Sequence, residues 1–259
     1  MELAVQAVTA STPIVAVLTA AIAPGIALLI YFYLKDKYAQ EPILMVLRVF
    51  LVGFLIVFPI MVIQHGLTMW WGTNQFVYSF IISSGVEEAV KWFVLYHMIY
   101  NHVEFDEHYD GILYAVAVSL GFATIENVMY ALTNHSSFAF LLSRALLPVS
   151  GHALFGILMG YYMGKAKFMG DERKTKRFLF YSLIVPIFWH GVYDIIMSSF
   201  TRTWIWLVLP LMIFLWYFGM SKVRRANLRS PFRMLHHEGE SERDLVQEQP
   251  DTYKIKSNR

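Results

Sequence analysis

The sequence predicts an all-α fold, a polytopic integral membrane bundle of about seven transmembrane helices around a polar site in the membrane core. The first observation is composition: the 259-residue chain is 57% hydrophobic and 15% charged, with a mean hydropathy of +0.48. Soluble domains carry about 25% charged residues. The second observation is a series of apolar runs, each of about 18 residues or more, which is the length that crosses a bilayer as a helix. These runs span residues 13–34, 43–63, 76–98, 111–132, 138–163, 178–200 and 203–220.

The runs and the polar sequence after them define two regions. We assign residues 1–220 to one transmembrane domain, whose polar motifs lie within 83–194. Residues 221–259 are basic at first and then acidic, and this composition predicts a disordered cytoplasmic tail. Small residues at four-residue spacing let membrane helices pack closely. Three glycines in the fifth run have this spacing: Gly156, Gly160 and Gly164.

The distribution of Lys and Arg predicts the orientation of the chain. Basic residues follow the first run, fill the loop 164–177 and follow the last run, whereas the loops 64–75 and 133–137 contain none. Because cytoplasmic loops are enriched in Lys and Arg, we expect the N-terminus outside and the C-terminus in the cytoplasm. The loop 99–110 would then be cytoplasmic although it is acidic, but acidic residues weigh little in this rule.

Charge and cysteine content narrow the possible partners. The net charge is only +2, and the basic residues lie at membrane edges, which favours contact with lipid over nucleic acid. The chain contains no Cys, so a bound metal would need His and carboxylate ligands. The sequence leaves the oligomeric state open.

The third observation is a charged stretch in the middle of the run 76–98. It contains Glu87, Glu88 and Lys91. A charge at the centre of a membrane helix costs about 2.5–3.5 kcal/mol, so such groups usually face a partner or a cavity. At about 100° per residue, Lys91 lies about 40° from Glu87 and one turn further along. The stretch therefore predicts a polar stripe that faces protein or water.

Three further runs also carry polar side chains. Glu126 and Asn127 lie in the fourth run and His152 lies in the fifth. His190 and Asp194 lie in the sixth run at i,i+4 spacing, which places them on one helix face. This spacing suits two ligands, or one ligand and the carboxylate that orients it.

The depths of these groups are compatible with one shared site. At 1.5 Å per residue, Glu87, His152 and His190 lie roughly 15–21 Å from the outer boundary of their runs, and Glu126 lies roughly 9 Å from it. Four helices would thus bring acids and imidazoles together in the middle to outer half of the bilayer.

This set of side chains is compatible with several functions. Two His and several carboxylates suit a catalytic zinc, which takes three protein ligands and leaves a position for water. The sequence lacks the HExxH helix of soluble metalloproteases. One alternative is a carrier or channel that relays protons or ions through the Glu and His side chains. Another is a non-catalytic scaffold in which the same groups form structural hydrogen bonds and ion pairs.

Four motifs in this order resemble a known family. Glu87-Glu88-Ala89-Val90-Lys91 is similar to an EExxK motif, and Phe122-Ala123-Thr124-Ile125-Glu126-Asn127 is similar to FxxxEN. His152 matches the motif histidine of the next helix, and His190-Gly191-Val192-Tyr193-Asp194 is similar to HGxYD. Together they resemble the PrsW family of bacterial intramembrane proteases, which is related to the CAAX prenyl endopeptidases and bacteriocin-processing proteins.

The resemblance implies an activity and a location. Members of this family make the site-1 cut in a single-pass membrane anti-sigma factor during envelope stress, and a second intramembrane protease then completes release of the sigma factor. The resemblance therefore implies a hydrolase in the bacterial cell membrane, with an anti-sigma factor as its substrate and partner.

The resemblance also implies roles for Glu87, Glu88 and Asn127. Glu87 would be the general base that activates water. Glu88 would be held by Lys91 or would bind the metal. Asn127 would help to stabilise the oxyanion.

The remaining residues would form the metal site. Glu126, His152 and His190 would bind Zn²⁺ or polarise the water, and Asp194 would orient His190 or join the coordination shell. The alternative is a metal-free reaction in which Glu and His activate the water. His190 and Asp194 would then serve the oxyanion.

Overall fold

The computed structural model describes residues 14–72, 74–133, 143, 145–200 and 203–233. Within these ranges the secondary structure is helical and contains no strand, as an all-α bundle requires. The elements are α2 (Ile14–Tyr33), α3 (Ile43–Trp71), α4 (Gln75–Val77), η1 (Tyr78–Ser83), α5 (Ser84–Met98), α6 (His108–Thr133), η2 (Ala145–Val149), α8 (Ser150–Lys167), α9 (Glu172–Ser199) and α10 (Trp204–Asn227).

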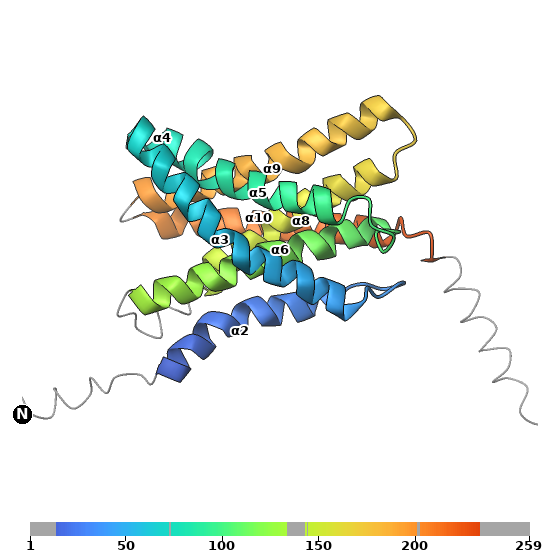
Figure 1. Cartoon of the computed structure of the whole chain (residues 1–259), viewed down its shortest axis with the longest axis horizontal. Coiled ribbons are helices and arrows are strands. Elements are labelled where there is room, and N and C mark those ends of the chain that lie inside the picture. Colours follow the sequence, from blue (N-terminus) through green and yellow to red (C-terminus); the bar gives the residue numbers. More distant parts are fainter. Residues whose placement is uncertain (1–13, 73, 134–142, 144, 201–202, 234–259) are drawn as a thin grey trace, which may run out of the picture.

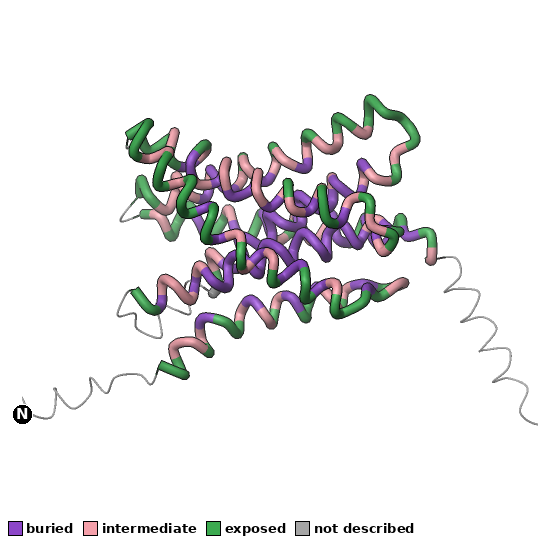
Figure 2. Tube along the Cα trace, in the orientation of Figure 1, coloured by how far each residue is buried: buried purple, intermediate pink, exposed green. Residues whose placement is uncertain are grey.

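Helices α6 and α8 form the centre of the bundle (Figure 1). Most residues of both helices are buried, and the buried colour is concentrated on them in Figure 2. Helices α2, α3, α9 and α10 pack around this pair, and only a minority of their residues are buried. A helix that is apolar on all sides belongs inside a bundle, whereas exposed apolar surface on the outer helices suits contact with lipid.

Six described helices are long and apolar enough to cross a membrane: α2, α3, α6, α8 with the end of η2, α9 and α10. Helix α5 has only 15 residues, but it continues from α4 and η1 without interruption. Together these three elements correspond to the third predicted run. The arrangement confirms a multi-pass helical membrane bundle.

The glycines of α8 allow the two central helices to touch, as their spacing predicts. A Cβ atom on Gly160 would overlap the backbone carbonyl of Gly111 in α6, and one on Gly156 would lie 2.8 Å from the carbonyl oxygen of Ala115. Only glycine permits this approach, because any side chain would push the helix backbones apart. The close packing brings the polar residues of α6 and α8 to the same side of the bundle.

Several helices extend beyond the ends predicted from the sequence: α8 continues to Lys167 and α9 begins at Glu172, both inside the predicted loop 164–177, and two others extend further still. Helix α3 continues to Trp71 instead of ending at residue 63, and α10 continues to Asn227 instead of 220. Gln64 and His65 are polar but do not break a helix, and apolar residues follow them up to Trp71. The division between a transmembrane domain and a tail at residue 220 stays a prediction, since 234–259 lie outside the described residues.

The loops rich in Lys and Arg lie at one end of the bundle. The α2–α3 and α8–α9 connections and the basic end of α10 are all on the right of Figure 1, and the acidic α5–α6 connection lies at the same end. This grouping is what the positive-inside pattern requires. The assignment of this end to the cytoplasm stays a prediction.

Two of the helices with site residues are preceded by π-helical turns. The segment η1 leads into α5, and η2 leads into α8. Such turns are rare, and they are often found at functional sites because they shift the angle of the side chains that follow.

Candidate active site

Lys91 lies at the centre of a buried polar cluster. Its ammonium donates a hydrogen bond to Oε1 of Glu88 at 2.8 Å and lies 3.6 Å from Oε2 of Glu87. It also lies 4.2 Å from the centre of the Phe122 ring. Lys91 and Glu88 are completely buried. Charged groups are retained in such an environment only when they are paired, so the Lys91–Glu88 ion pair holds the cluster together.

His152 is positioned by contacts at both ring nitrogens. The Lys91 ammonium lies 3.2 Å from Nδ1, and Oε2 of Glu126 lies 3.1 Å from Nε2. A lysine ammonium can only donate, so Nδ1 accepts its hydrogen bond. Nε2 therefore carries the proton and donates to the Glu126 carboxylate. The Phe122 ring meets the imidazole edge-on, with centroids 5.3 Å apart.

His190 has the opposite arrangement. Nδ1 lies 3.0 Å from Oε1 of Glu88 and donates to it, because a carboxylate accepts. Nε2 faces two further acids, with Oδ1 of Asp194 at 3.6 Å and Oε2 of Glu87 at 3.9 Å. The ring of Phe155 stacks on the imidazole at a centroid distance of 4.7 Å. A carboxylate on Nδ1 that directs Nε2 to the reactive side is a common arrangement for metal-binding histidines.

Glu87 connects the cluster to a hollow between α3 and α6. The hollow has a volume of about 290 Å³. Gln64 donates from Nε2 to Oε1 of Glu87 at 3.1 Å, whereas Oε2 of Glu87 has no hydrogen-bond partner in the described part of the chain. The lining residues are Val57, Ile60, Met61, Gln64, Glu87, Phe122, Glu126, Met129, Tyr130 and Thr133. Water or a peptide in this hollow would therefore meet a buried carboxylate within an apolar wall.

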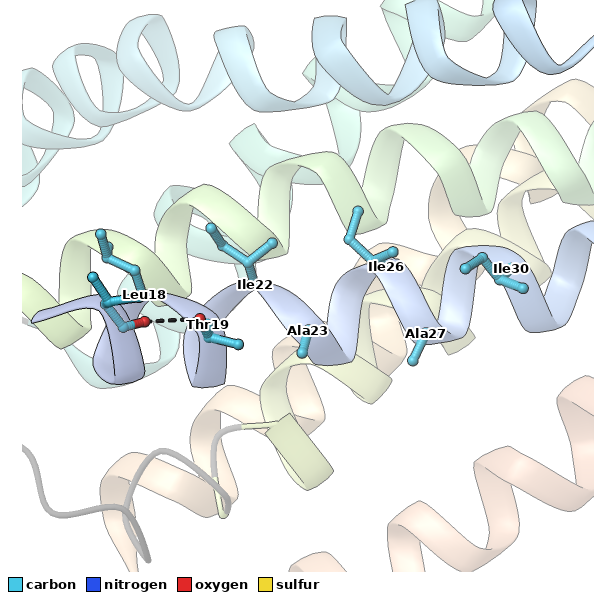
Figure 3. Close-up of a pocket in the computed structure, with 8 residues that line it drawn as sticks. Leu18, Thr19, Ile22, Ala23, Ile26, Ala27 and Ile30 are labelled. Carbon is cyan, nitrogen blue, oxygen red and sulfur yellow. Dashed lines mark hydrogen bonds between the residues drawn. The ribbon is translucent and has the colours of Figure 1, made fainter. Parts of the chain in front are cut away.

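A second hollow has a different character. It has a volume of about 520 Å³ and is lined only by residues of α2, which Figure 3 shows along that helix. Apart from Thr19 these side chains are apolar, and the Thr19 hydroxyl already donates to the carbonyl of Val15 at 2.8 Å. This hollow therefore offers no acid or base for chemistry.

Most of the residues predicted for the site meet here. Glu87, Glu88 and Lys91 come from α5, Glu126 comes from α6, His152 from α8, and His190 with Asp194 from α9. Their contacts join these four helices around one cluster. Asn127 makes a different described contact, because its amide donates to the carbonyl of Ala21 at 2.9 Å and so links α6 to α2. The oxyanion role of Asn127 stays a prediction.

The cluster has a donor set that fits a divalent metal. One possible ligand atom from each of Glu87, Glu88, His152 and His190 lies within 4.8 Å of the others. Imidazole nitrogens and carboxylate oxygens are the ligands of catalytic zinc sites that lack Cys. Oε2 of Glu87 and Oε2 of Glu88 are buried without a hydrogen-bond partner among the described residues. This group contains His152 and His190, two of the four predicted ligands. The ligand roles of Glu126 and Asp194 stay predictions.

The structure adds residues that sequence reasoning missed. Gln64 contacts Glu87 but was placed in the loop 64–75, since the apolar run ended at residue 63. Phe122 and Phe155 flank the two imidazoles, although aromatic residues are common throughout the runs. A polar amide directly after an apolar run was the available signal for Gln64.

Comparison with known proteins agrees with this geometry. The family described as PrsW family intramembrane metalloprotease matches residues 41–220. Protease PrsW of Bacillus subtilis (strain 168) is 51% identical over 212 residues, which are 82% of this chain and 95% of that protein. Protease PrsW of Geobacillus kaustophilus (strain HTA426) is 48% identical over 210 residues, 81% of this chain and 91% of that protein.

A third relative extends the agreement. Protease PrsW of Halalkalibacterium halodurans is 44% identical over 211 residues, 81% of this chain and 96% of that protein. No solved structure matches the chain significantly. The matched region includes every residue of the buried cluster. The chain therefore belongs to the PrsW family of intramembrane metalloproteases and is a multi-pass membrane peptidase.

Proposed function

We propose that the chain is a site-1 intramembrane endopeptidase of the bacterial cell membrane that cleaves a single-pass anti-sigma factor in envelope stress signalling. The peptidase activity is supported by the position of Glu87, whose buried carboxylate borders an apolar hollow and lies beside His190. The anti-sigma factor rests on the resemblance of the four motifs. A single-pass substrate suits the site, because an apolar peptide segment can lie against the apolar lining of the hollow.

Glu87 is the proposed general base. Gln64 holds Oε1, and Oε2 has no competing hydrogen bond among the described residues. Because Glu87 borders the hollow, its carboxylate can accept a proton from water there while that water attacks the scissile carbonyl carbon. The same carboxyl group can then pass this proton to the leaving amine, so that one water is added across one amide bond.

The other side chains position and polarise the reactants. Glu88 accepts from Lys91 and from His190, which fixes the imidazole and directs its Nε2 toward Glu87. His152 donates to Glu126 and is held by Lys91 on its other nitrogen. These contacts hold the groups in place before substrate binds, which is where the benefit of a buried polar site arises.

Zinc is the proposed metal. A Zn²⁺ ion held by His190 and carboxylates of the cluster, and by His152 once its ring gives up the contact with Lys91 or Glu126, would act as a Lewis acid that activates water at neutral pH. The zinc content of purified protein tests this assignment. We expect about one Zn²⁺ per chain in the wild type and little in a His152→Ala/His190→Ala variant. Equal and negligible zinc in both would favour the metal-free mechanism and leave the peptidase assignment intact.

Co-expression tests the proposed substrate. The chain would be expressed with a tagged single-pass anti-sigma factor from the same bacterium, and the fragments would be followed by immunoblotting. We expect a membrane-embedded fragment with the wild type and none with His190→Ala. A matched substrate whose membrane segment is replaced by an unrelated apolar span serves as the control. Cleavage of the control and of the anti-sigma factor at equal rates would argue against the proposed specificity.

A further inference from the structure

A second cluster of buried acids lies far from the catalytic groups in the chain, at the basic end of the bundle. Asp36 follows α2, and Glu107 and Asp110 lie at the start of α6. One carboxylate oxygen from each lies within 4.8 Å of the others. Glu107 and Asp110 are completely buried, and Asp36 is only 4% exposed. Three acids at this distance repel one another strongly unless a cation or protons separate them.

The carboxylate oxygens of this cluster are largely unpartnered. Within the described part of the chain, both oxygens of Asp36, both oxygens of Glu107 and Oδ1 of Asp110 have no hydrogen-bond partner. The Ser230 hydroxyl lies near Glu107 without hydrogen-bond geometry. Among the described residues, no Lys or Arg lies within ion-pair distance of these three acids. Buried polar atoms normally have partners, so these five oxygens require either a bound cation or protons shared between the acids.

The cluster is held rigidly by the surrounding backbone. Oδ2 of Asp110 accepts hydrogen bonds from the backbone amides of Asp106 and Glu107, at 2.9 and 2.6 Å. The side chain of Tyr109 donates to the carbonyl of Phe32 at 2.6 Å, which fixes the end of α2 against α6. The Asn227 amide donates to the carbonyl of Lys35 at 3.3 Å and so adds the end of α10. A preorganised set of oxygens costs little rearrangement when it binds an ion.

The three carboxylates therefore lack a compensating positive charge among the described side chains. A hard divalent cation would supply it, because Mg²⁺, Ca²⁺ and Mn²⁺ prefer carboxylate oxygen ligands.

We propose that Asp36, Glu107 and Asp110 form a second metal site that binds a hard divalent cation such as Mg²⁺ or Ca²⁺ and clamps α2 and α6 together. The site contains only oxygen ligands, in contrast to the His and carboxylate cluster around Lys91. Glu41 lies beside it and accepts a hydrogen bond from the Tyr114 hydroxyl. Its second carboxylate oxygen can complete the shell through a water molecule.

Binding of Mn²⁺ to the purified full-length protein tests this site directly. The protein would be stripped with EDTA, and free Mn²⁺ would be counted by electron paramagnetic resonance, with Mg²⁺ and Ca²⁺ as competitors. We expect one saturable Mn²⁺ that Mg²⁺ or Ca²⁺ displaces. The affinity for Mn²⁺ should fall at least tenfold in Glu107→Gln. If Glu107→Gln fails to fold, Asp36→Asn should show the same loss of affinity. Glu104→Gln is the matched control, an acid of the same loop outside the triad, and it should bind as the wild type does.

The two metal sites are distinguished by a further variant. His152→Ala/His190→Ala should keep the Mn²⁺ that Mg²⁺ displaces, because the acidic triad does not use imidazole. Loss of this Mn²⁺ in the histidine variant would assign it to the catalytic cluster and overturn the proposal. Absence of saturable Mn²⁺ in the wild type, or unchanged affinity in Glu107→Gln and Asp36→Asn, would also overturn it and indicate acids that share protons.

Discussion

Lys91 neutralises a carboxylate that has no access to solvent. The ammonium and Oε1 of Glu88 lie 2.8 Å apart, and both side chains are completely buried. Replacement by Met keeps a long side chain but leaves Glu88 charged and unpaired. We expect Lys91→Met to lower the free energy of unfolding by about 3–5 kcal/mol, measured by denaturant titration in mixed micelles.

The surface pair of Lys176 and Glu172 provides the control for this prediction. These groups lie 2.6 Å apart and are both well exposed. We expect Lys176→Met to change stability by less than about 1 kcal/mol. Equal stability of the two variants would show that the Lys91–Glu88 pair does not hold the buried cluster together.

Gln64 orients the proposed base from a neighbouring helix. Its amide donates to Oε1 of Glu87 at 3.1 Å, and Ala at this position would let the carboxylate rotate. We expect Gln64→Ala to reduce kcat by about 10–100-fold with a smaller change in KM. Gln40→Ala is the matched control, because Gln40 is exposed in the connection between α2 and α3. A kcat for Gln64→Ala equal to that of the control would remove Gln64 from the site.

The sequence identifies site residues well where a polar side chain lies inside an apolar run. It identifies them poorly where polar side chains are common, as in loops. Glu87, His152 and His190 stand out because each is expensive inside an apolar run. Gln64 lies where a run seemed to end, and the acids Asp36 and Glu107 lie in loops where acids are common. Only their contacts across long sequence separations give them a role.

Helices α6 and α8 depend on close backbone contact. The Cα of Gly160 faces the carbonyl of Gly111 with no room for a methyl group. We expect Gly160→Ala to lower the free energy of unfolding by about 1–3 kcal/mol, because the helices must separate to accommodate the methyl group. Thermal unfolding in detergent measures the difference.

Gly66 in α3 provides the matched control for the helix contact. No atom lies within 4 Å of a Cβ built at this position. Gly66→Ala should be neutral or stabilising by up to about 1 kcal/mol, because Ala favours the helix. Destabilisation by both substitutions to the same degree would indicate a loss of helix propensity instead of packing.

Hydropathy predicts the positions of the membrane helices well and the residues at which they end less well. The apolar runs predict where the described membrane helices lie, because a spanning helix must be apolar over most of its length. The ends of α3 and α10 were wrong because polar residues continue both helices without breaking them. The division of the third run into α4, η1 and α5 depends on backbone geometry that hydropathy does not report.

The orientation of the whole molecule can be tested with single cysteines, because the chain has none of its own. Gly170 and Thr203 are both exposed and lie in connections at opposite ends of the bundle. If the C-terminus is cytoplasmic, a membrane-impermeant maleimide should label Thr203→Cys in intact cells and Gly170→Cys only after lysis. The reverse labelling pattern would invert the proposed topology.

The convergence of the site is a property of the whole bundle. Depth along each run indicates that the polar groups can meet, but not which atoms touch. The contact between Lys91 and His152 spans 61 residues of sequence, and it depends on how α5 packs against α6 and α9, which both contact α8. The acidic triad at the other end joins α2 and α6 in the same way, and no single run predicts it.

Cleavage by a Glu87→Gln variant tests the shared site most directly. Purified wild type and variant would be reconstituted in liposomes with a single-pass substrate, and the rate of cleavage would be measured under single-turnover conditions. Glu172→Gln, which makes the same change on the exposed start of α9, serves as the control. We expect Glu87→Gln to insert and fold normally but to cleave at least about 100-fold more slowly, because the amide cannot accept the proton of water. Cleavage by Glu87→Gln at the rate of the wild type and Glu172→Gln would contradict a site in which this carboxylate activates water.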